Sequence, residues 1–451
     1  MLTLLAHAAP ISYKFPLPIW LYVVAGGAAV LLSAPVAAVA VSTGEVREWR
    51  GADLYPLVRR LRVGPILVVL LSLVAVEALI GGIFSTTVES TQFFENPVTV
   101  ITWVDFWVGL GIVSAFVGNV WERVSPLNVG ARALDRVLAR HGVQPLAYPE
   151  RLGQWPAVGL LLAWSWMELI WGQAKDPRTL GLLLIAYAIA TLVGCTIFGA
   201  ETWLGNVEVF SVFARTFSRF SPIELRPFVP EQWSTAPPDE RSARLRPYGA
   251  GLRTDPGLPV GGGAFILTTL ATVVFDGWSQ TDTFGRLQEW FWQRWSFLAT
   301  HVDVLQTLSM IAVFAIFVAA YLLVTRSHAR LYAPTLIPIA AAYFAAHYFA
   351  YLLIAGQDTP AVLIDPFGHS WNPLGWGEYD LWKGIAPAAV VWGLQVGLIV
   401  WGHVSGVFAA HRLGQPNRTR GRALVLQAPL VILMVVYTVA GLWVLAQQIK
   451  A

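Results

Sequence analysis

Apolar residues gather along this chain in ten runs that are separated by polar segments. Each run is close to the ~20 residues that a helix needs to cross the ~30 Å of hydrocarbon in a bilayer. The pattern therefore predicts an all-α fold, a polytopic transmembrane helical bundle of about ten spans. The predicted spans are residues 18–41, 63–85, 98–120, 155–172, 179–200, 259–277, 303–325, 333–356, 384–408 and 425–448.

Basic residues fall almost entirely in alternate gaps between these runs. The gaps after the first, third, fifth, seventh and ninth runs hold 23 of the 30 lysines and arginines. Because positively charged loops stay in the cytoplasm, we expect both termini to be extracytoplasmic and the protein to lie in the cytoplasmic membrane. The opposite side keeps only Lys14, Lys175, Arg178, Arg286, Arg294, Lys383 and Lys450.

The composition leaves no room for a large soluble domain. Hydrophobic residues make up 56% of the 451 positions and charged residues only 13%, with a mean hydropathy of +0.59. The net charge of +3 lies in the predicted cytoplasmic loops, so it favours the lipid bilayer as a partner and gives no reason to expect a nucleic acid. The single cysteine, Cys195, excludes an intrachain disulfide and a thiolate cluster for a metal.

One long polar segment divides the chain. Residues 221–258 are rich in proline, arginine and acidic residues and lack apolar periodicity, which is typical of a linker. They separate a first five-span half, residues 1–220, from a second five-span half, residues 259–451, and no internal sequence repeat relates the two halves.

Three smaller features bear on the membrane fold. Residues 201–220 and 284–297 have the spacing of amphipathic helices, so we expect both to lie at the membrane interface. The pair Gly402 and Gly406 would let the ninth span approach a neighbour closely. The acidic external loop 357–382 is long enough to act as a lid or as a docking face for a partner.

Ionisable residues inside a span are costly, so each one is a candidate for function. At ~1.5 Å per residue, several lie in the outer half of the bilayer or at its outer edge, on different spans. These residues are Glu77, Asp105, Glu168, Asp276, His301, Asp303 and His347. In one shared cavity they could hold a divalent metal, activate a water or relay protons. The alternative is that they pair off locally to hold the helices together. His403 lies at a different depth from His347, which argues against a bis-histidine haem.

Signatures of soluble enzymes are absent from the sequence, which has no Gly-x-Ser-x-Gly elbow, P-loop, His-Glu-x-x-His pair or Rossmann fingerprint. Short motifs along the whole chain instead resemble a family of bacterial polytopic membrane proteins labelled fenitrothion hydrolase. The motifs are Leu5-Ala6-His7, Pro16-Leu17-Pro18-Ile19-Trp20, Val117-Gly118-Asn119-Val120-Trp121, Ser125-Pro126-Leu127-Asn128, Phe275-Asp276-Gly277, Ala346-His347-Tyr348-Phe349, Gln357, Asp365-Pro366-Phe367-Gly368, Gln395-Val396, Gly402-His403-Val404-Ser405-Gly406 and His411. The resemblance implies an integral-membrane hydrolase of organophosphorus triesters in a bacterial cytoplasmic membrane, and it brings no catalytic residues with it.

Two classes of function follow. The first is a hydrolase whose apolar phosphotriester substrate enters laterally from the lipid, with a metal that lowers the pKa of a bound water. Its candidate catalytic residues are His347, Glu77 and Asp105, and its candidate metal ligands are His347, His301, Asp303 and Glu168. The second class is a non-enzymatic membrane component, either a transporter of ions or small solutes or an accessory subunit of a larger respiratory or metal-handling complex.

Overall fold

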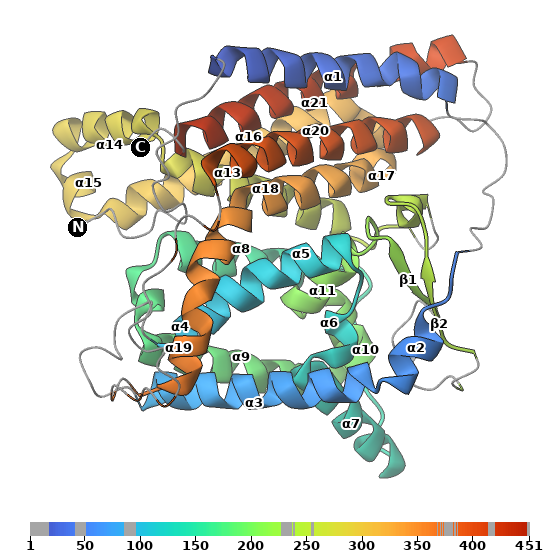
Figure 1. The fold of residues 1–451 in the computed structure, drawn as a ribbon, viewed down its shortest axis with the longest axis vertical. Helices are drawn as coiled ribbons and strands as arrows, with labels where there is room; N and C mark the ends of the chain where they lie inside the picture. The colour runs from blue at the N-terminus through green and yellow to red at the C-terminus, as the bar shows by residue number, and fades with distance from the viewer. Residues whose placement is uncertain are drawn as a thin grey trace.

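Helices form nearly all of the regular structure in the computed structural model of the chain (Figure 1). The structure describes residues 18–40, 51–84, 96–226, 240–253, 257–367, 387–413 and 420–448, together with the single positions 237, 369, 371, 373, 382 and 385. The motif Leu5-Ala6-His7 and residues 374–381 of the external loop lie outside the described residues. The predicted all-α class is confirmed.

Seven segments are long and apolar enough to cross a membrane, which makes the chain a multi-pass membrane protein by length and composition. One of them, residues 302–364, contains two of the predicted spans. The predicted fourth and sixth spans are the helices α8 (Trp155–Leu169) and α13 (Gly262–Ser279), which are not among the seven. The count of ten spans therefore stays a prediction.

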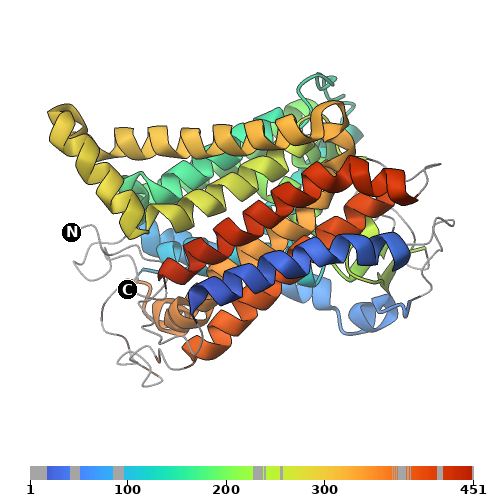
Figure 2. The ribbon, with the colours of Figure 1, turned by 90° about the horizontal axis from the view of Figure 1, so that it is seen from above.

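The long helices have roughly aligned axes in the view of Figure 1 and are inclined to one another in the view of Figure 2. They are α1 (Ile19–Ala40), α3 (Val63–Ile83), α9 (Pro177–Phe198), α16 (Val302–Thr325), α18 (Ile337–Ala355), α20 (Ala388–Leu413) and α21 (Arg420–Gln448). A further span is built from α4 (Pro97–Thr99), the π-helix η3 (Val100–Val108) and α5 (Gly109–Phe116). The shorter helices are α2 (Tyr55–Arg60), α6 (Trp121–Val124), α7 (Pro126–Arg140), η4 (Gly172–Lys175), α10 (Ala200–Asn206), α11 (Val209–Phe217), η5 (Ala250–Arg253), α14 (Asp282–Arg294), α15 (Ser296–Thr300), η6 (Arg326–His328), α17 (Ala329–Tyr332), η7 (Ala333–Leu336), η8 (Gly356–Asp358) and α19 (Thr359–Ile364).

Close contact between α18 and α20 depends on two glycines. A Cβ atom at Gly402 would lie 2.4 Å from the Cβ of Ala342 and 2.7 Å from the carbonyl oxygen of Pro338. At Gly406 it would lie 2.9 Å from the carbonyl oxygen of Thr335. The expected close approach of this span to a neighbour is confirmed, because only residues without a side chain let the two backbones come so near.

The expected interfacial position of residues 201–220 is wrong. This stretch folds as α10 and α11, and α11 packs against α5, α8 and α18 inside the bundle. Phe213, Phe217 and Phe220 are each at most 1% exposed. The reason is that the polar residues of this stretch meet buried polar partners on other elements, described below, so they do not need the lipid headgroups.

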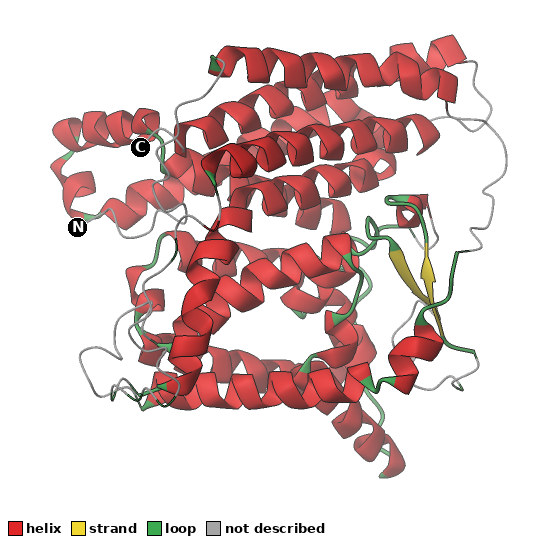
Figure 3. Cartoon of the chain, viewed as in Figure 1, coloured by secondary structure: helices red, strands yellow, loops and turns green. Residues whose placement is uncertain are grey.

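The predicted linker 221–258 contains a small sheet that the sequence analysis did not anticipate (Figure 3). Strands β1 (Ile223–Arg226) and β2 (Ser242–Leu245) pair antiparallel, with Ile223 opposite Leu245. The segment between the first two predicted spans contacts this sheet, since the backbone N–H of Leu54 donates to the carbonyl oxygen of Ala243 at 2.8 Å. The two arginine-rich segments therefore form one folded region at this end of the bundle.

Helix α14 extends away from the bundle and carries exposed aromatic residues. Figure 2 shows it leaving one end of the bundle at a steep angle to α16. Trp290 is 47% exposed, Trp295 is 49% exposed and the Arg294 guanidinium lies over the Trp290 ring. An interfacial position for this helix stays a prediction, and an amphipathic aromatic helix at the end of the spans is consistent with it.

Candidate functional site

A buried carboxyl group on α13, that of Asp276, is the centre of a hydrogen-bonded cluster inside the bundle. Asp276 is 1% exposed. Its Oδ2 atom lies 2.8 Å from His347 Nε2 and accepts a hydrogen bond from the Tyr348 hydroxyl at 2.8 Å. Its Oδ1 atom accepts from the Gln280 side-chain amide at 2.8 Å. Two side chains of α18 and one at the C-cap of α13 therefore hold one carboxyl group in the interior of a membrane protein.

The imidazole of His347 has one ring nitrogen committed and one available. Nε2 meets Asp276, so a neutral ring that donates from Nε2 leaves Nδ1 as an acceptor. His347 is 7% exposed, and Nδ1 has no hydrogen-bond partner among the described residues. The ring of Tyr343, one turn earlier on α18, stacks on the imidazole with centroids 6.4 Å apart. Nδ1 can therefore make a further hydrogen bond while Nε2 keeps its contact with Asp276.

A second carboxyl group lies close to this pair. Glu168 on α8 is 7% exposed and near enough to Asp276 for the two groups to interact electrostatically. The indole of Trp107 lies beside Glu168. Two carboxylates in the same apolar interior repel each other, so a shared proton stabilises the cluster.

Polar groups continue from this cluster toward the far end of α18. Tyr351, one turn beyond His347, interacts electrostatically with both Glu168 and Asp276, and also with Asp105 and Asp358. Asp105 accepts a hydrogen bond from the Thr359 hydroxyl at 2.7 Å. It sits in the nine-residue π-helix η3, an arrangement that is frequent at functional sites because it displaces side chains from the regular α-helical register.

The remaining predicted residues lie apart from the cluster. Glu77 on α3 is partly exposed and makes no hydrogen bond or ion pair within the part of the chain that the structure describes. His301 is exposed and stacks on Phe297, with ring centroids 4.3 Å apart. Asp303, in the first turn of α16, is exposed as well. Of the predicted site residues, His347 contacts Asp276 and Glu168 interacts with it electrostatically, and Asp105 interacts electrostatically with Tyr351.

The predicted metal site has no matching cluster in the described ranges. No group of three or more His, Cys, Asp or Glu side chains there is arranged to hold a metal ion. A divalent metal and a metal-activated water therefore stay predictions from the sequence.

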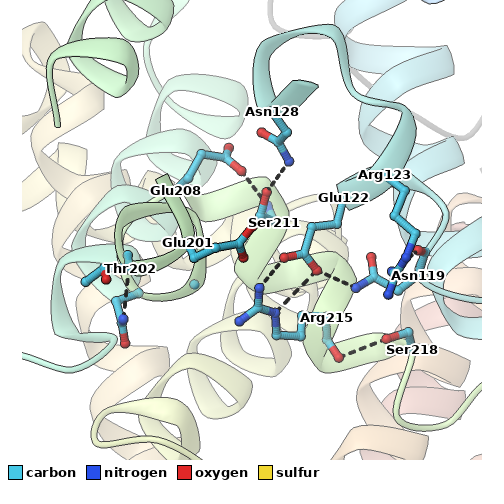
Figure 4. Close-up of polar contacts among 12 residues, drawn as sticks. Asn119, Glu122, Arg123, Asn128, Glu201, Thr202, Glu208, Ser211, Arg215 and Ser218 are labelled. Carbon is cyan, nitrogen blue, oxygen red and sulfur yellow. Dashed lines mark hydrogen bonds and ion pairs between the residues drawn. The ribbon is translucent and has the colours of Figure 1, made fainter. Parts of the chain in front are cut away.

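A second buried polar cluster lies beside α6, around Glu122 (Figure 4). The Glu122 carboxylate is fully buried, forms a bidentate pair with the Arg215 guanidinium and accepts from the Asn119 amide at 2.5 Å. Arg132 donates to the Glu122 carbonyl oxygen and to the Glu201 carboxylate, each at 2.6 Å. Four helices, α6, α7, α10 and α11, are tied together by these bonds.

The charges of this second cluster perturb one another. Burial alone would raise the pKa of Glu122, but the guanidinium of Arg215, with Arg123 and Arg132, holds it below its usual value. Burial lowers the pKa of Arg123 to about 10, against the opposing effect of Glu122. Glu122 and Arg215 therefore remain an ion pair at neutral pH, and removal of either partner would leave the other charge buried without it.

Sequence reasoning missed the roles of Asp276 and Glu122. The sequence places Asp276 at the edge of a predicted span, and the candidate residues follow from depth and residue type only. A usable signal was present, because Gln280 lies one turn after Asp276 and can donate to it. Glu122 follows the third predicted span and was assigned to a cytoplasmic loop, so nothing in its local sequence indicated burial.

Comparisons with known proteins add no identification: no family model, no curated protein and no solved structure matches this chain.

Proposed function

We propose that this protein is a membrane transporter whose transport cycle includes uptake and release of a proton at the cluster of Asp276, Glu168 and His347. The observation that carries the proposal is the Asp276 carboxyl group, 1% exposed, held by His347, Tyr348 and Gln280. An ionisable group in the membrane interior is retained at a substantial cost, and proton relays are one of the functions that require it.

Charge balance explains why this cluster is suited to exchange a proton. The cluster contains two buried carboxyl groups, those of Asp276 and Glu168, so each proton that it loses adds one negative charge. Release of one proton leaves an excess negative charge in the apolar interior, which is costly in a bilayer-spanning bundle. The protonation state of the cluster is therefore coupled to how the surrounding helices pack and hydrate it, which is what a proton-coupled conformational cycle requires.

The chain of polar groups toward η3 supplies a route for the proton. The buried Tyr351 interacts electrostatically with the two carboxyl groups of the cluster and with those of Asp105 and Asp358. A hydroxyl both donates and accepts, so it can pass a proton between neighbouring groups. By the predicted topology, this route opens on the extracytoplasmic side.

The test is proton flux into liposomes that contain the purified protein and an internal pH-sensitive dye, driven by an imposed membrane potential. Asp276→Asn and Glu168→Gln each remove one titrating carboxyl with little change in shape, and both are expected to abolish the flux. Glu77→Gln is the matched control, since Glu77 is a partly exposed carboxyl on α3 outside the cluster, and it should leave the flux unchanged.

Infrared difference spectra on a pH jump give a second measurement that needs no transported solute. The wild-type protein should show a protonated-carboxyl band that is missing in Asp276→Asn or Glu168→Gln. Wild-type liposomes without proton flux, together with spectra that do not depend on either residue, would reject the proposal. The hydrolase that the resemblance implies has no supporting observation among the described residues, and it stays a prediction from the sequence.

A further inference from the structure

A cavity lies along the half of α20 that ends in the arginine-rich region. It has a volume of about 240 Å³. One wall is a stripe of α20 that recurs at the helical period, and the opposite wall comes from the segment around η5. The α20 wall consists of Trp401, Val404, Ser405, Phe408, Ala409, Arg412 and Leu413, and the opposite wall of Tyr248, Gly249 and Leu252. From Trp401 to Arg412 the stripe is about 16 Å long at ~1.5 Å per residue.

One end of this cavity, at Tyr248 and Trp401, is aromatic. The rings of Tyr248 and Trp401 lie 5.0 Å apart at 82°, and Phe220 lies 4.9 Å from Trp401. The hydroxyl of Tyr248 donates to the carbonyl oxygen of Phe116 at 3.1 Å, so it is already used within the protein. This end therefore offers an occupant mainly apolar surface.

The other end is cationic. Arg412 lies in the last turn of α20 and is exposed, and Ser405 is the remaining polar residue of the α20 wall. A mainly apolar cavity with a guanidinium at one end matches a molecule with a long apolar tail and an anionic head. A small soluble anion would gain little from the aromatic end, and a neutral oil would gain nothing from Arg412.

We infer that this cavity is a binding site for an anionic phospholipid, with one acyl chain along the α20 stripe and the phosphate at Arg412. The choice of a phospholipid rests on position: Arg412 lies at the end of a predicted span, on the side that carries 23 of the 30 basic residues. Basic pockets between membrane helices at that side bind anionic headgroups, because the lipid presents its phosphate at that depth. The inference is independent of the proton-exchange proposal.

The test compares phosphatidylglycerol with phosphatidylcholine of identical chains, added to delipidated protein in detergent and counted by native mass spectrometry. The wild-type protein should retain phosphatidylglycerol about five-fold more tightly, the preference expected from ~1 kcal/mol for one basic residue near the headgroup. Arg412→Gln should remove the preference. Arg330→Gln, an exposed arginine in the gap after α16 that does not line the cavity, should keep it.

A second variant tests the binding of the acyl chain separately from that of the headgroup. Ser405→Trp places an indole in the cavity without touching the charge at Arg412, and it should lower retention of both lipids while thermal unfolding without lipid stays like that of the wild type. Equal retention of the two lipids by the wild-type protein, a preference that survives Arg412→Gln, or full retention in a folded Ser405→Trp variant would each overturn the inference.

Discussion

The buried ion pair of Glu122 and Arg215 yields the most quantitative expectation about stability. Glu122→Gln keeps the shape of the side chain and removes its charge, so the guanidinium of Arg215 loses its carboxylate inside the fold. Breaking a buried pair by removing one partner costs ~3–5 kcal/mol. The Arg215 side chain is 24% exposed, so water partly compensates it, and we expect a loss of about 3 kcal/mol, at the low end of that range.

Cys195 supplies the assay. It is the sole cysteine of the chain and is 1% exposed, packed with Ala131, Ala200 and Leu204 near the cluster. A thiol-reactive fluorescent dye therefore reports unfolding at one known position. The unfolding entropy is ~2.1 cal/mol/K per residue, and the chain has 451 residues. If it unfolds as one unit, a loss of about 3 kcal/mol should lower the Tm of Glu122→Gln by about 3 °C relative to the wild type.

Two comparisons make the reasoning refutable. Glu201→Gln removes a carboxylate whose side chain is 20% exposed, and it should cost only about 1 kcal/mol, as more exposed ion pairs do. The double variant Glu122→Gln with Arg215→Gln removes both charges and should recover part of the loss. Two results would refute this reasoning: a loss of stability in Glu122→Gln no larger than that in Glu201→Gln, or a loss in the double variant equal to the sum of the losses in Glu122→Gln and Arg215→Gln. Either would mean that the charge of Glu122 does not contribute to stability through Arg215.

Three further expectations use the same dye assay. The pKa of Glu122 is lower in the folded protein than its ordinary value of 4.5, so the contribution of its charge to stability is fully present above about pH 4.5 and disappears as the pH falls through the folded pKa. The wild-type Tm should therefore approach the Tm of Glu122→Gln in acid. A Tm difference between the two proteins that stays constant down to low pH would contradict this. Gly402→Leu should lower stability by ~1–3 kcal/mol or more, since the new Cβ would meet Ala342 and the Pro338 backbone. Gly393→Leu on the same helix is the control: a Cβ there has nothing within 4 Å, so its effect should be near neutral. Similar Tm values for the two variants would refute the packing argument. Phe213→Ala should cost ~3–5 kcal/mol of stability, because Phe213 is 0% exposed and packs against Trp107, Phe217 and Phe344. Trp290→Ala on α14 should change the Tm little, since Trp290 is exposed. An equal loss at both positions would mean that α14 is not peripheral.

Hydropathy and charge along the chain were enough to predict an all-helical membrane protein. Six of the seven segments that could cross a bilayer each overlap one predicted span, and the seventh, residues 302–364, contains two, because the free energy of inserting a helix depends mainly on its own side chains. The close helix approach at Gly402 and Gly406 could also be predicted from the sequence, since it needs only the absence of side chains at that spacing.

Only the tertiary structure decided which polar groups meet. Asp276 and His347 are 71 positions apart, and Glu122 and Arg215 are 93 positions apart, so no local pattern pairs them. Helix α11 shows the same limit: its aromatic and arginine residues fit a membrane surface as well as a buried position, and the choice depended on a carboxylate supplied by α6. Local sequence sets how each segment partitions into lipid, whereas partners for buried charges come from helix packing, which joins distant parts of the chain.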